Sequence, residues 1–380
     1  MSSYWLSEAR PPLLARALEG DPDVAVIGGG VTGCSCALTL ARGGLRVRLH
    51  EARELAGGAS GRNGGFALRG GAMAYDQARE WLGPERARTY WRLTEQAIGR
   101  MAELAGDALR RVGSFRLAGD EEERDELRRE YQMLREDGFA VEWRDDLEPS
   151  LHGRYPGAIY HPSDAVLQPA RLVRRLAAMA AAAGAEIREH ARVESLDEVD
   201  ADVVLVATDG YPSGLLGELE GLIIPTRGQM IATEPLPELL FPIPHYGNHG
   251  FDYWHQDTEG RMLAGGFRHV DFGAEFTAEE ATTTPIQDAL EAFVESLFGR
   301  RPRVTHRWAG IFGFVPDLLP VVGPVPGGGR LWVAGGYSGH GNVLGFACGE
   351  LVARAILGDR DPLLDLFDPG RLLTSDGVSR

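Results

Sequence analysis

The sequence of 380 residues contains no lysine, so all 39 of its Lys and Arg residues are arginines. The absence of lysine excludes chemistry that needs a side-chain amine, such as Schiff-base formation or the lysine of a phosphate-binding loop. Acidic residues number 55, which gives a formal net charge of −16. This negative charge argues against nucleic acid or an anionic membrane as a partner.

Cysteines and long apolar runs are also scarce. Cys34, Cys36 and Cys348 form no C-x-x-C pair and do not suggest a disulfide framework, and buried packing is the favoured role for Cys34 and Cys36. No apolar run approaches the ~20 residues of a membrane helix, and residues 1–20 show no signal-peptide pattern. We therefore expect a cytoplasmic protein without a membrane span, with a chain long enough for two domains.

A strand–helix–strand unit is predicted near the N-terminus. The apolar segment Asp23–Ile27 predicts a buried strand, Val31–Arg42 a helix and Leu45–His50 a second strand. Later segments predict further helices and strands of parallel type, and residues 225–271 favour an antiparallel sheet. The helices are expected over 75–105, 121–136, 168–183, 283–298 and 342–357, and the strands over 186–193, 202–207 and 331–334.

The first turn of this unit carries a nucleotide-binding pattern, Gly28-x-Gly30-x-x-Gly33. Its glycines permit a tight turn, the close approach of a pyrophosphate and close packing of helix against strand. Glu51 ends the second strand, where a carboxylate can accept hydrogen bonds from ribose hydroxyls and disfavours NADP. Together these features predict a dinucleotide site, and they leave FAD and NAD open.

Further motifs resemble one group of flavoenzymes. GGASGRNGGF stands at Gly57–Phe66 and GYSGHG at Gly336–Gly341, with Gly228-Gln229-Met230, Trp308-Ala309-Gly310 and Asp317-x-x-Pro320-x-x-Gly323 between them. In this order the motifs resemble the D-amino-acid oxidase superfamily of FAD-dependent enzymes, which includes glycine and sarcosine oxidases. The segment ASGRNGG and the N-terminal SYWL look most like its gamma-glutamylputrescine oxidase-like branch.

The resemblance implies an α/β fold with a discontinuous FAD-binding domain. This Rossmann-like domain, of the glutathione-reductase type, is expected over residues 21–75, 150–215 and 305–360. An inserted antiparallel-sheet substrate domain is expected over 76–149 and 216–304, with terminal extensions at 1–20 and 361–380. Parallel-type strands that recur early, in the middle and late in the chain agree with this division.

The same resemblance implies non-covalent FAD, since no cysteine lies where this superfamily attaches its flavin. The backbone of Ser60–Gly65 can line the diphosphate-ribityl region, and the helix after Gly336–Gly341 can point its N-terminus at the flavin. Resemblance places Val193 beside the adenine. The expected cofactor-binding residues are Gly28, Gly30, Val31, Thr32, Gly33, Glu51, Ala52, Arg53, Ala59, Ser60, Gly61, Arg62, Asn63, Gly64, Gly65, Val193, Ala207, Thr208, Gly310, Gly313, Gly336, Tyr337, Ser338, Gly339, His340, Gly341 and Asn342.

The implied reaction is oxidation of the C–N bond of an amine or amino acid. A hydride would pass to flavin N5, water would hydrolyse the imine, and O2 would be reduced to H2O2. Sarcosine oxidases place a lysine above the flavin for oxygen activation, so its absence favours a dehydrogenase with another electron acceptor. An NAD-dependent dehydrogenase and a non-catalytic FAD-binding subunit are the remaining alternatives.

Two positions that hold a substrate carboxylate in related oxidases are Val343 and Phe312 here. Arg69 or Arg268 can replace them, because an unpaired carboxylate is costly to desolvate. Aromatic residues can pack an alkyl amine or ammonium, although packing in the sheet core is the simpler role for each alone. The predicted substrate-binding residues are Arg69, Tyr246, Tyr253, Trp254, Arg268, Phe314 and Tyr337.

His340 and Tyr253 are the catalytic candidates. His340 stands in the glycine loop Gly336–Gly341, where it can polarise the flavin or an oxygen species, or simply make a loop hydrogen bond. His245, His249 and His255 lie close in sequence but lack a metal-ligand pattern, so no metal site is expected.

Overall fold

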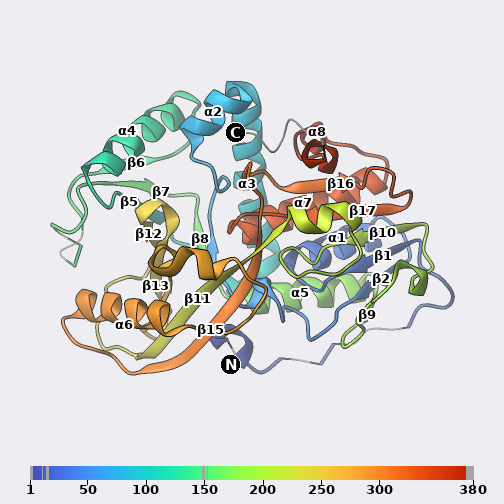
Figure 1. Cartoon of the computed structure of the whole chain (residues 1–380), viewed down its shortest axis with the longest axis horizontal. Coiled ribbons are helices and arrows are strands. Elements are labelled where there is room, and N and C mark those ends of the chain that lie inside the picture. Colours follow the sequence, from blue (N-terminus) through green and yellow to red (C-terminus); the bar gives the residue numbers. More distant parts are fainter. Residues whose placement is uncertain (1–2, 11, 14–16, 148–149, 152, 374–380) are drawn as a thin grey trace.

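The computed structural model describes residues 3–10, 12–13, 17–147, 150–151 and 153–373. Two large sheets lie side by side, and helices pack around both of them (Figure 1). The α/β class predicted from the sequence is therefore confirmed. Among the described residues, no helix is both long and apolar enough to cross a membrane.

The smaller of the two sheets, here called the parallel sheet, is built around the first strand–helix–strand unit. Its strands are β1 (Val24–Ile27), β2 (Val47–His50), β9 (Glu186–Arg188), β10 (Val203–Val206), β16 (Val321–Pro324) and β17 (Leu331–Gly335). Their order is β16-β17-β10-β1-β2-β9, and all neighbours are parallel except β16 and β17. The four residues of β1 are all buried, as expected for an apolar strand at the centre of such a sheet.

A layer of helices packs beside the parallel sheet. It consists of α1 (Val31–Arg42), α3 (Pro84–Ala105), α5 (Pro169–Ala182) and α7 (Gly341–Ile356). Helix α1 contacts both α5 and α7. A Cβ on Gly349 of α7 would lie 2.1 Å from Ser35 Oγ, so only glycine permits this approach to α1. The three cysteines are free and buried in this layer, as predicted for Cys34 and Cys36.

The second sheet, here called the large sheet, has eight strands. They are β5 (Ser114–Leu117), β6 (Glu142–Arg144), β7 (Ala158–His161), β11 (Ile224–Pro235), β12 (His245–Gly247), β13 (Asp252–Gln256), β14 (Arg261–Gly266) and β15 (Val304–Phe314). In the order β15-β11-β14-β13-β12-β5-β7-β6, only β12 and β5 pair in parallel. Residues 225–271 thus supply the predicted antiparallel strands, but segments on both sides complete the sheet.

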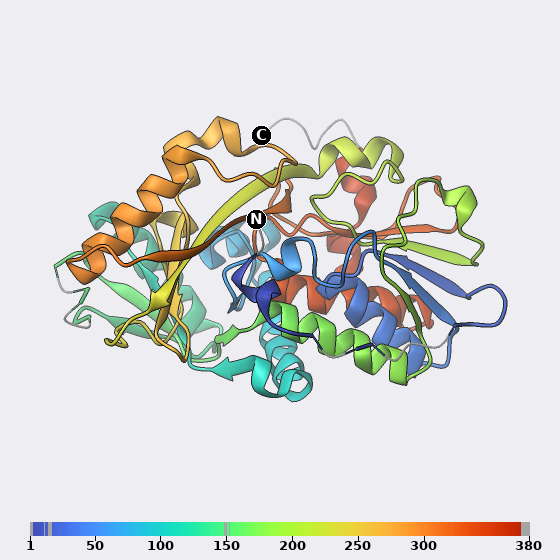
Figure 2. The same ribbon diagram turned by 90° about the horizontal axis from the view of Figure 1, so that it is seen from below.

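Helix α6 (Thr284–Phe298) packs on the large sheet and closes a separate core over Trp254, Ile286 and Leu290. Strands β11 and β15 are long and pair from Ile224 and Phe314 to Thr233 and Val304. Figure 2 shows them as long ribbons that extend from the large sheet toward the parallel sheet. They therefore connect the two halves of the molecule.

The remaining elements include a three-stranded sheet of β3 (Phe66–Ala67), β8 (Ala165–Leu167) and β4 (Leu109–Arg111), and the helices α2 (Tyr75–Leu82), α4 (Glu121–Glu136) and α8 (Leu363–Leu366). The single helix predicted over 75–105 is wrong, because Gly83 leaves the helical region with φ of +83° and ψ of 154°. The strand predicted over 186–193 ends at Arg188.

Candidate active site

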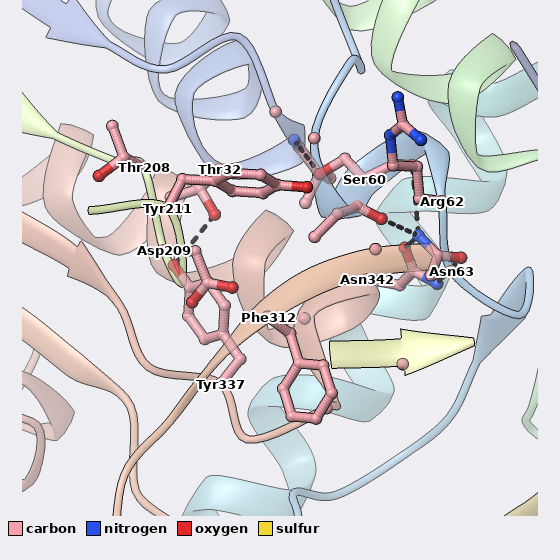
Figure 3. Close-up of a pocket in the computed structure, with 18 of the residues that line it drawn as sticks. Thr32, Ser60, Arg62, Asn63, Thr208, Asp209, Tyr211, Phe312, Tyr337 and Asn342 are labelled. Atoms are coloured by element: carbon pink, nitrogen blue, oxygen red, sulfur yellow. Dashed lines mark hydrogen bonds between the residues drawn. The ribbon is translucent and has the colours of Figure 1, made fainter. Parts of the chain in front are cut away.

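A cavity of about 560 Å³ is lined by residues of the parallel sheet and of the large sheet. This volume falls within the range of roughly 300–1,000 Å³ that is usual for ligand pockets. Its walls bring together segments from the beginning, middle and end of the chain, such as those of Thr32, Asp209 and Asn342 (Figure 3). These segments all follow or precede strands of the parallel sheet or lie on the large sheet.

The first glycine motif forms the turn between β1 and α1. Gly28 has φ of +115°, and a Cβ there would lie 2.6 Å from the carbonyl oxygen of Ala207. A Cβ on Gly33 would lie 1.9 Å from the carbonyl oxygen of Gly28, so this glycine lets the helix pack against the turn. The N-cap residue of α1, Gly30, has no side chain to cap the helix, and the N-terminus of α1 therefore offers an anion-binding end to the cavity.

Glu51 ends β2 at the cavity wall. Its Oε2 accepts a hydrogen bond of 2.7 Å from the backbone N–H of Gly29, and its Oε1 accepts one of 2.7 Å from Arg53. A carboxylate has about four acceptor positions, so Glu51 can still accept hydrogen bonds from a ribose. The carboxylate of Glu51 therefore stabilises the turn at Gly29 and also faces the cavity.

The segment Gly57–Phe66, here called the second glycine segment, is tied to the start of α7. The side-chain amides of Asn63 and Asn342 donate to each other at 3.0 Å, and Asn342 also donates to the carbonyl of Phe66 at 2.8 Å. Ser60 Oγ accepts a hydrogen bond of 3.0 Å from the N–H of Val31 at the start of α1. Figure 3 shows Asn63 and Asn342 next to each other. The starts of α1 and α7 thus meet the same loop.

The segment Gly336–Gly341, here called the third glycine segment, leads into α7. The hydroxyl groups of Tyr337 and Thr32 lie 3.0 Å apart, which joins this loop to α1. His340 precedes the first residue of α7, and burial lowers the pKa of its imidazole to about 4. Within the described chain, His340 Nδ1 is buried without a hydrogen-bond partner. His340 therefore lines the cavity as a neutral imidazole.

Asp209 was missed by the sequence analysis. It follows β10 with φ of +52°, and its carboxylate accepts hydrogen bonds from the N–H groups of Gly313 at 2.9 Å and Gly336 at 2.8 Å. Burial raises the pKa of Asp209, while these backbone N–H groups lower it. The residue therefore fastens β15 and the third glycine segment to the end of β10. Its only sequence signal is its position after an apolar strand.

Aromatic side chains from the large sheet cover the other side of the cavity. Tyr246, Tyr253 and Phe314 line it as predicted, and Phe251 and Phe312 join them. Burial raises the pKa of Tyr253 to about 12, so its phenol is protonated at neutral pH. This wall is suited to an apolar or cationic group.

Arg268 is the cation of this wall. Its guanidinium lies 5.2 Å from the ring centre of Phe251 and 5.2 Å from that of Phe312. Throughout the described residues, no side chain or backbone group forms a hydrogen bond or ion pair with it. Burial lowers the pKa of Arg268. A half-buried arginine that faces a cavity and has no anionic partner is suited to bind an anion.

Two predicted substrate residues lie away from the cavity. The Arg69 guanidinium is buried and forms an ion pair with Glu95 at 2.9 Å, so its charge is already neutralised. Trp254 is fully buried under α6 and stacks on His245. Because Tyr253 and Trp254 are neighbours in β13, their side chains point to opposite faces of the sheet. Only Tyr253 reaches the cavity.

Most predicted cofactor residues line the cavity, but a group of glycines lies behind its surface. Their lack of side chains lets the lining segments pack closely, as Gly65 does, where a Cβ would lie 2.7 Å from Leu167 O. These glycines are Gly33, Gly61, Gly65, Gly313 and Gly336. The lining residues that were not among the predicted site residues include Gly58, Asp209, Tyr211, Gly228, His249, Phe251, Ala278, Phe312 and Leu318, although Gly58, Gly228 and Phe312 stand in or beside the motifs.

Residues 23–355 match the protein family described as FAD dependent oxidoreductase. The chain is 29% identical over 392 residues to the probable oxidoreductase OrdL of Rhizobium meliloti, covering 94% of this chain and 88% of that protein. It is 26% identical over 382 residues to the gamma-glutamylputrescine oxidoreductase of Escherichia coli, covering 89% of this chain and 84% of the relative. The crystal structure of glycine oxidase from Geobacillus kaustophilus is similar, with a TM-score of 0.76 at 25% identity, covering 92% and 98% of the two chains.

Proposed function

The chain belongs to the family of FAD dependent oxidoreductases, and from this premise we propose that it oxidises the C–N bond of an amine that carries a carboxylate. Two similar proteins are named for glycine and for gamma-glutamylputrescine, and both compounds are amines. The relatives support the reaction class, and the cavity supports the substrate class.

The cavity fits FAD. The three glycines of the first motif leave room that any Cβ would fill, and the starts of α1 and α7 offer backbone N–H groups. Glu51 is suited to hold the ribose, and the segment around Ser60 and Asn63 to hold the region beyond the diphosphate. The three cysteines are buried in the helical layer away from the cavity lining, which supports non-covalent binding.

The observation that carries the substrate proposal is Arg268. Its guanidinium is held between Phe251 and Phe312 and forms no ion pair within the described residues. A carboxylate that binds there would satisfy the arginine and would fix the orientation of the substrate. Arg69, the alternative anchor, is paired with Glu95 and is not retained in the proposal.

When bound, FAD supplies the acceptor for a hydride from the substrate carbon next to the nitrogen. Arg268 would orient that carbon, and the rings of Tyr246, Tyr253 and Phe314 would exclude water around it. His340 is neutral at pH 7 because burial lowers its pKa to about 4, so it offers a hydrogen bond without adding a charge. Tyr253 can donate a hydrogen bond from its protonated phenol.

The electron acceptor is O2, which would yield H2O2, or a different oxidant. The absence of lysine from the whole chain favours the second candidate, a dehydrogenase, since no ammonium group can assist oxygen. Oxygen consumption during turnover, compared with reduction of an artificial dye, decides between the two.

The proposal is tested by anaerobic titration of the holoenzyme with paired substrates, glycine against methylamine and sarcosine against dimethylamine. Loss of the flavin absorption band reports oxidation of the amine. We expect only the member of each pair that carries a carboxylate to be oxidised and to bleach the flavin absorption band. The R268Q variant should weaken binding of that substrate by about 10- to 100-fold, since it removes a charge-assisted hydrogen bond.

The matched control is R42Q, which makes the same change at an exposed arginine of α1. R42Q should titrate as the unchanged protein does. Equal weakening of both members of a pair by R268Q would contradict carboxylate binding at Arg268. Absence of bleaching by every amine would contradict C–N oxidation itself.

A further inference from the structure

The segment between η7 (Arg268–Glu275) and α6 crosses from the large sheet to the cofactor side of the cavity. We propose that Glu280, in the middle of this segment, is a positioning residue that holds the segment closed over the cavity and slows the release of FAD. The proposal concerns cofactor retention, so it does not depend on which amine is oxidised.

Both ends of the segment are fixed to β11. Glu275 is buried and forms an ion pair with Arg227 at 2.7 Å, and it accepts hydrogen bonds from Gln229 at 3.1 and 3.2 Å. At the other end, the N–H of Thr283 donates to Gln229 Oε1 at 2.9 Å. Two neighbouring residues of one face of β11 therefore anchor residues 276–282 as a bridge.

The middle of the bridge is held by the carboxylate of Glu280. It accepts a hydrogen bond of 2.5 Å from the phenol of Tyr211 and hydrogen bonds of 2.8 and 2.9 Å from Arg53. Arg62 Nε lies 3.6 Å from the same carboxylate. The guanidinium of Arg53 also lies 5.0 Å from the ring centre of Tyr211, so the partners support each other. Burial raises the pKa of Tyr211, which keeps its phenol protonated as a donor.

The partners of Glu280 come from two connections of the cofactor side, the one between β2 and β3 and the one after β10. Arg53 follows β2, Arg62 follows η2 (Ala59–Gly61), and Tyr211 follows β10. All three line the cavity, as does Ala278 of the bridge itself. One carboxylate thus joins the bridge to the connection between β2 and β3 and to the loop after β10, both of which line the cavity.

The contacts of Glu280 should make the closure of the bridge depend on the salt concentration. The side chain of Arg53 is 44% exposed and that of Glu280 is 22% exposed, so dissolved ions can screen their attraction. Opening of the bridge should therefore become easier as the salt concentration rises. A bridge held only by packing would not respond in this way.

The test measures FAD release from the holoenzyme after dilution, followed by the rise in flavin fluorescence. In E280Q, release should be about tenfold faster at low salt, since the charge-assisted bonds to Arg53 are lost. Release from the unchanged protein should accelerate with KCl, while release from E280Q should be nearly independent of it. Hydrogen exchange of residues 276–283 and 208–213 should increase in E280Q.

The matched control is E279Q, one residue away on the same bridge. In the described chain the Glu279 side chain forms no hydrogen bond or ion pair, so this variant should release FAD as the unchanged protein does. If E280Q fails to retain FAD during purification, Y211F serves instead, because it removes only the hydroxyl donor. Release unaffected in E280Q and Y211F, or equally accelerated in E279Q, would overturn the proposal. No amine is added, so failure here is distinct from failure of the proposed reaction.

Discussion

At the scale of single residues, Asp209 shows how much one buried carboxylate can position. Its two oxygens accept the N–H groups of Gly313 and Gly336. In the D209N variant, an amide NH2 group would face one of these backbone N–H groups. Both of these donors would then be buried without a hydrogen-bond acceptor. We expect its free energy of unfolding to fall by about 1–3 kcal/mol and its affinity for FAD to fall with it.

Urea denaturation and FAD titration measure the two effects of D209N. The exposed Asp202, near the start of the same strand, gives the control variant D202N, which should change neither quantity. Unchanged FAD affinity in D209N would show that the third glycine segment keeps its position without this carboxylate.

The residues of the site could be predicted from the sequence to the extent that local motifs define them. Gly28, Gly30 and Ser60 stand in motifs whose spacing carries the information, and all three line the cavity. The choice between Arg69 and Arg268 could not be made, since it depends on partners. Arg69 is neutralised by Glu95 on a helix, whereas Arg268 lies between two rings that are distant in sequence.

At the scale of elements, the break between α2 and α3 depends on Gly83. Its φ of +83° and ψ of 154° belong to a region that only glycine adopts readily, and a Cβ there would meet no atom within 4 Å. G83A should therefore lower the free energy of unfolding by about 1–3 kcal/mol through backbone strain alone. Urea denaturation measures this change.

The control for G83A is G221A, since Gly221 is also free of neighbouring atoms and lacks a positive φ. This variant should change stability by less than about 0.5 kcal/mol. A stability of G83A equal to that of G221A would show that this backbone conformation imposes no measurable strain on alanine.

Elements with a clear hydrophobic period were predicted well. Helices α1, α4, α6 and α7 lie within a residue or so of the expected ranges, because each shows a buried face at helical spacing. The short strands β5, β6 and β7 were missed. Their place in the large sheet is set by pairing with β12 and with each other, which local sequence does not encode.

At the scale of the whole molecule, several histidines are buried in the neutral state. Burial lowers the pKa to about 4 for His50, His255 and His340, and to about 3 for His245. The unfolded chain takes up protons near pH 6.5 while the folded protein does not, so stability is complete above pH 6.5 and is lost as pH falls toward 4. Each histidine contributes up to roughly 1.4 kcal/mol per pH unit in this window.

Thermal unfolding at fixed ionic strength measures this effect. Tm should fall steeply between pH 6.5 and pH 5, and these histidines should have no effect between pH 7 and pH 8.5, where they are neutral in both states. A flat Tm from pH 6.5 to pH 5 would show that the imidazoles become charged without unfolding.

The division into two domains stays a prediction, and its proposed boundaries do not coincide with the boundaries of the two sheets. β7 falls within residues 150–215 and β15 largely within 305–360, yet both belong to the large sheet. Such pairings join residues far apart along the chain. Composition and periodicity describe each segment but not its partner, so this level of organisation is the hardest to predict from one sequence.

The cavity is lined from Ile27 to Val343, and this has a consequence for biosynthesis. The turn of Gly28 leaves the ribosome early, but the start of α7, which completes the cofactor side, emerges only after some three hundred further residues. Since chains fold progressively from the N-terminus during synthesis, the early strand–helix–strand unit must wait with its anion-binding end exposed. Loading of the flavin therefore waits until α7 has been synthesised, and the early strand–helix–strand unit cannot complete the cofactor site alone.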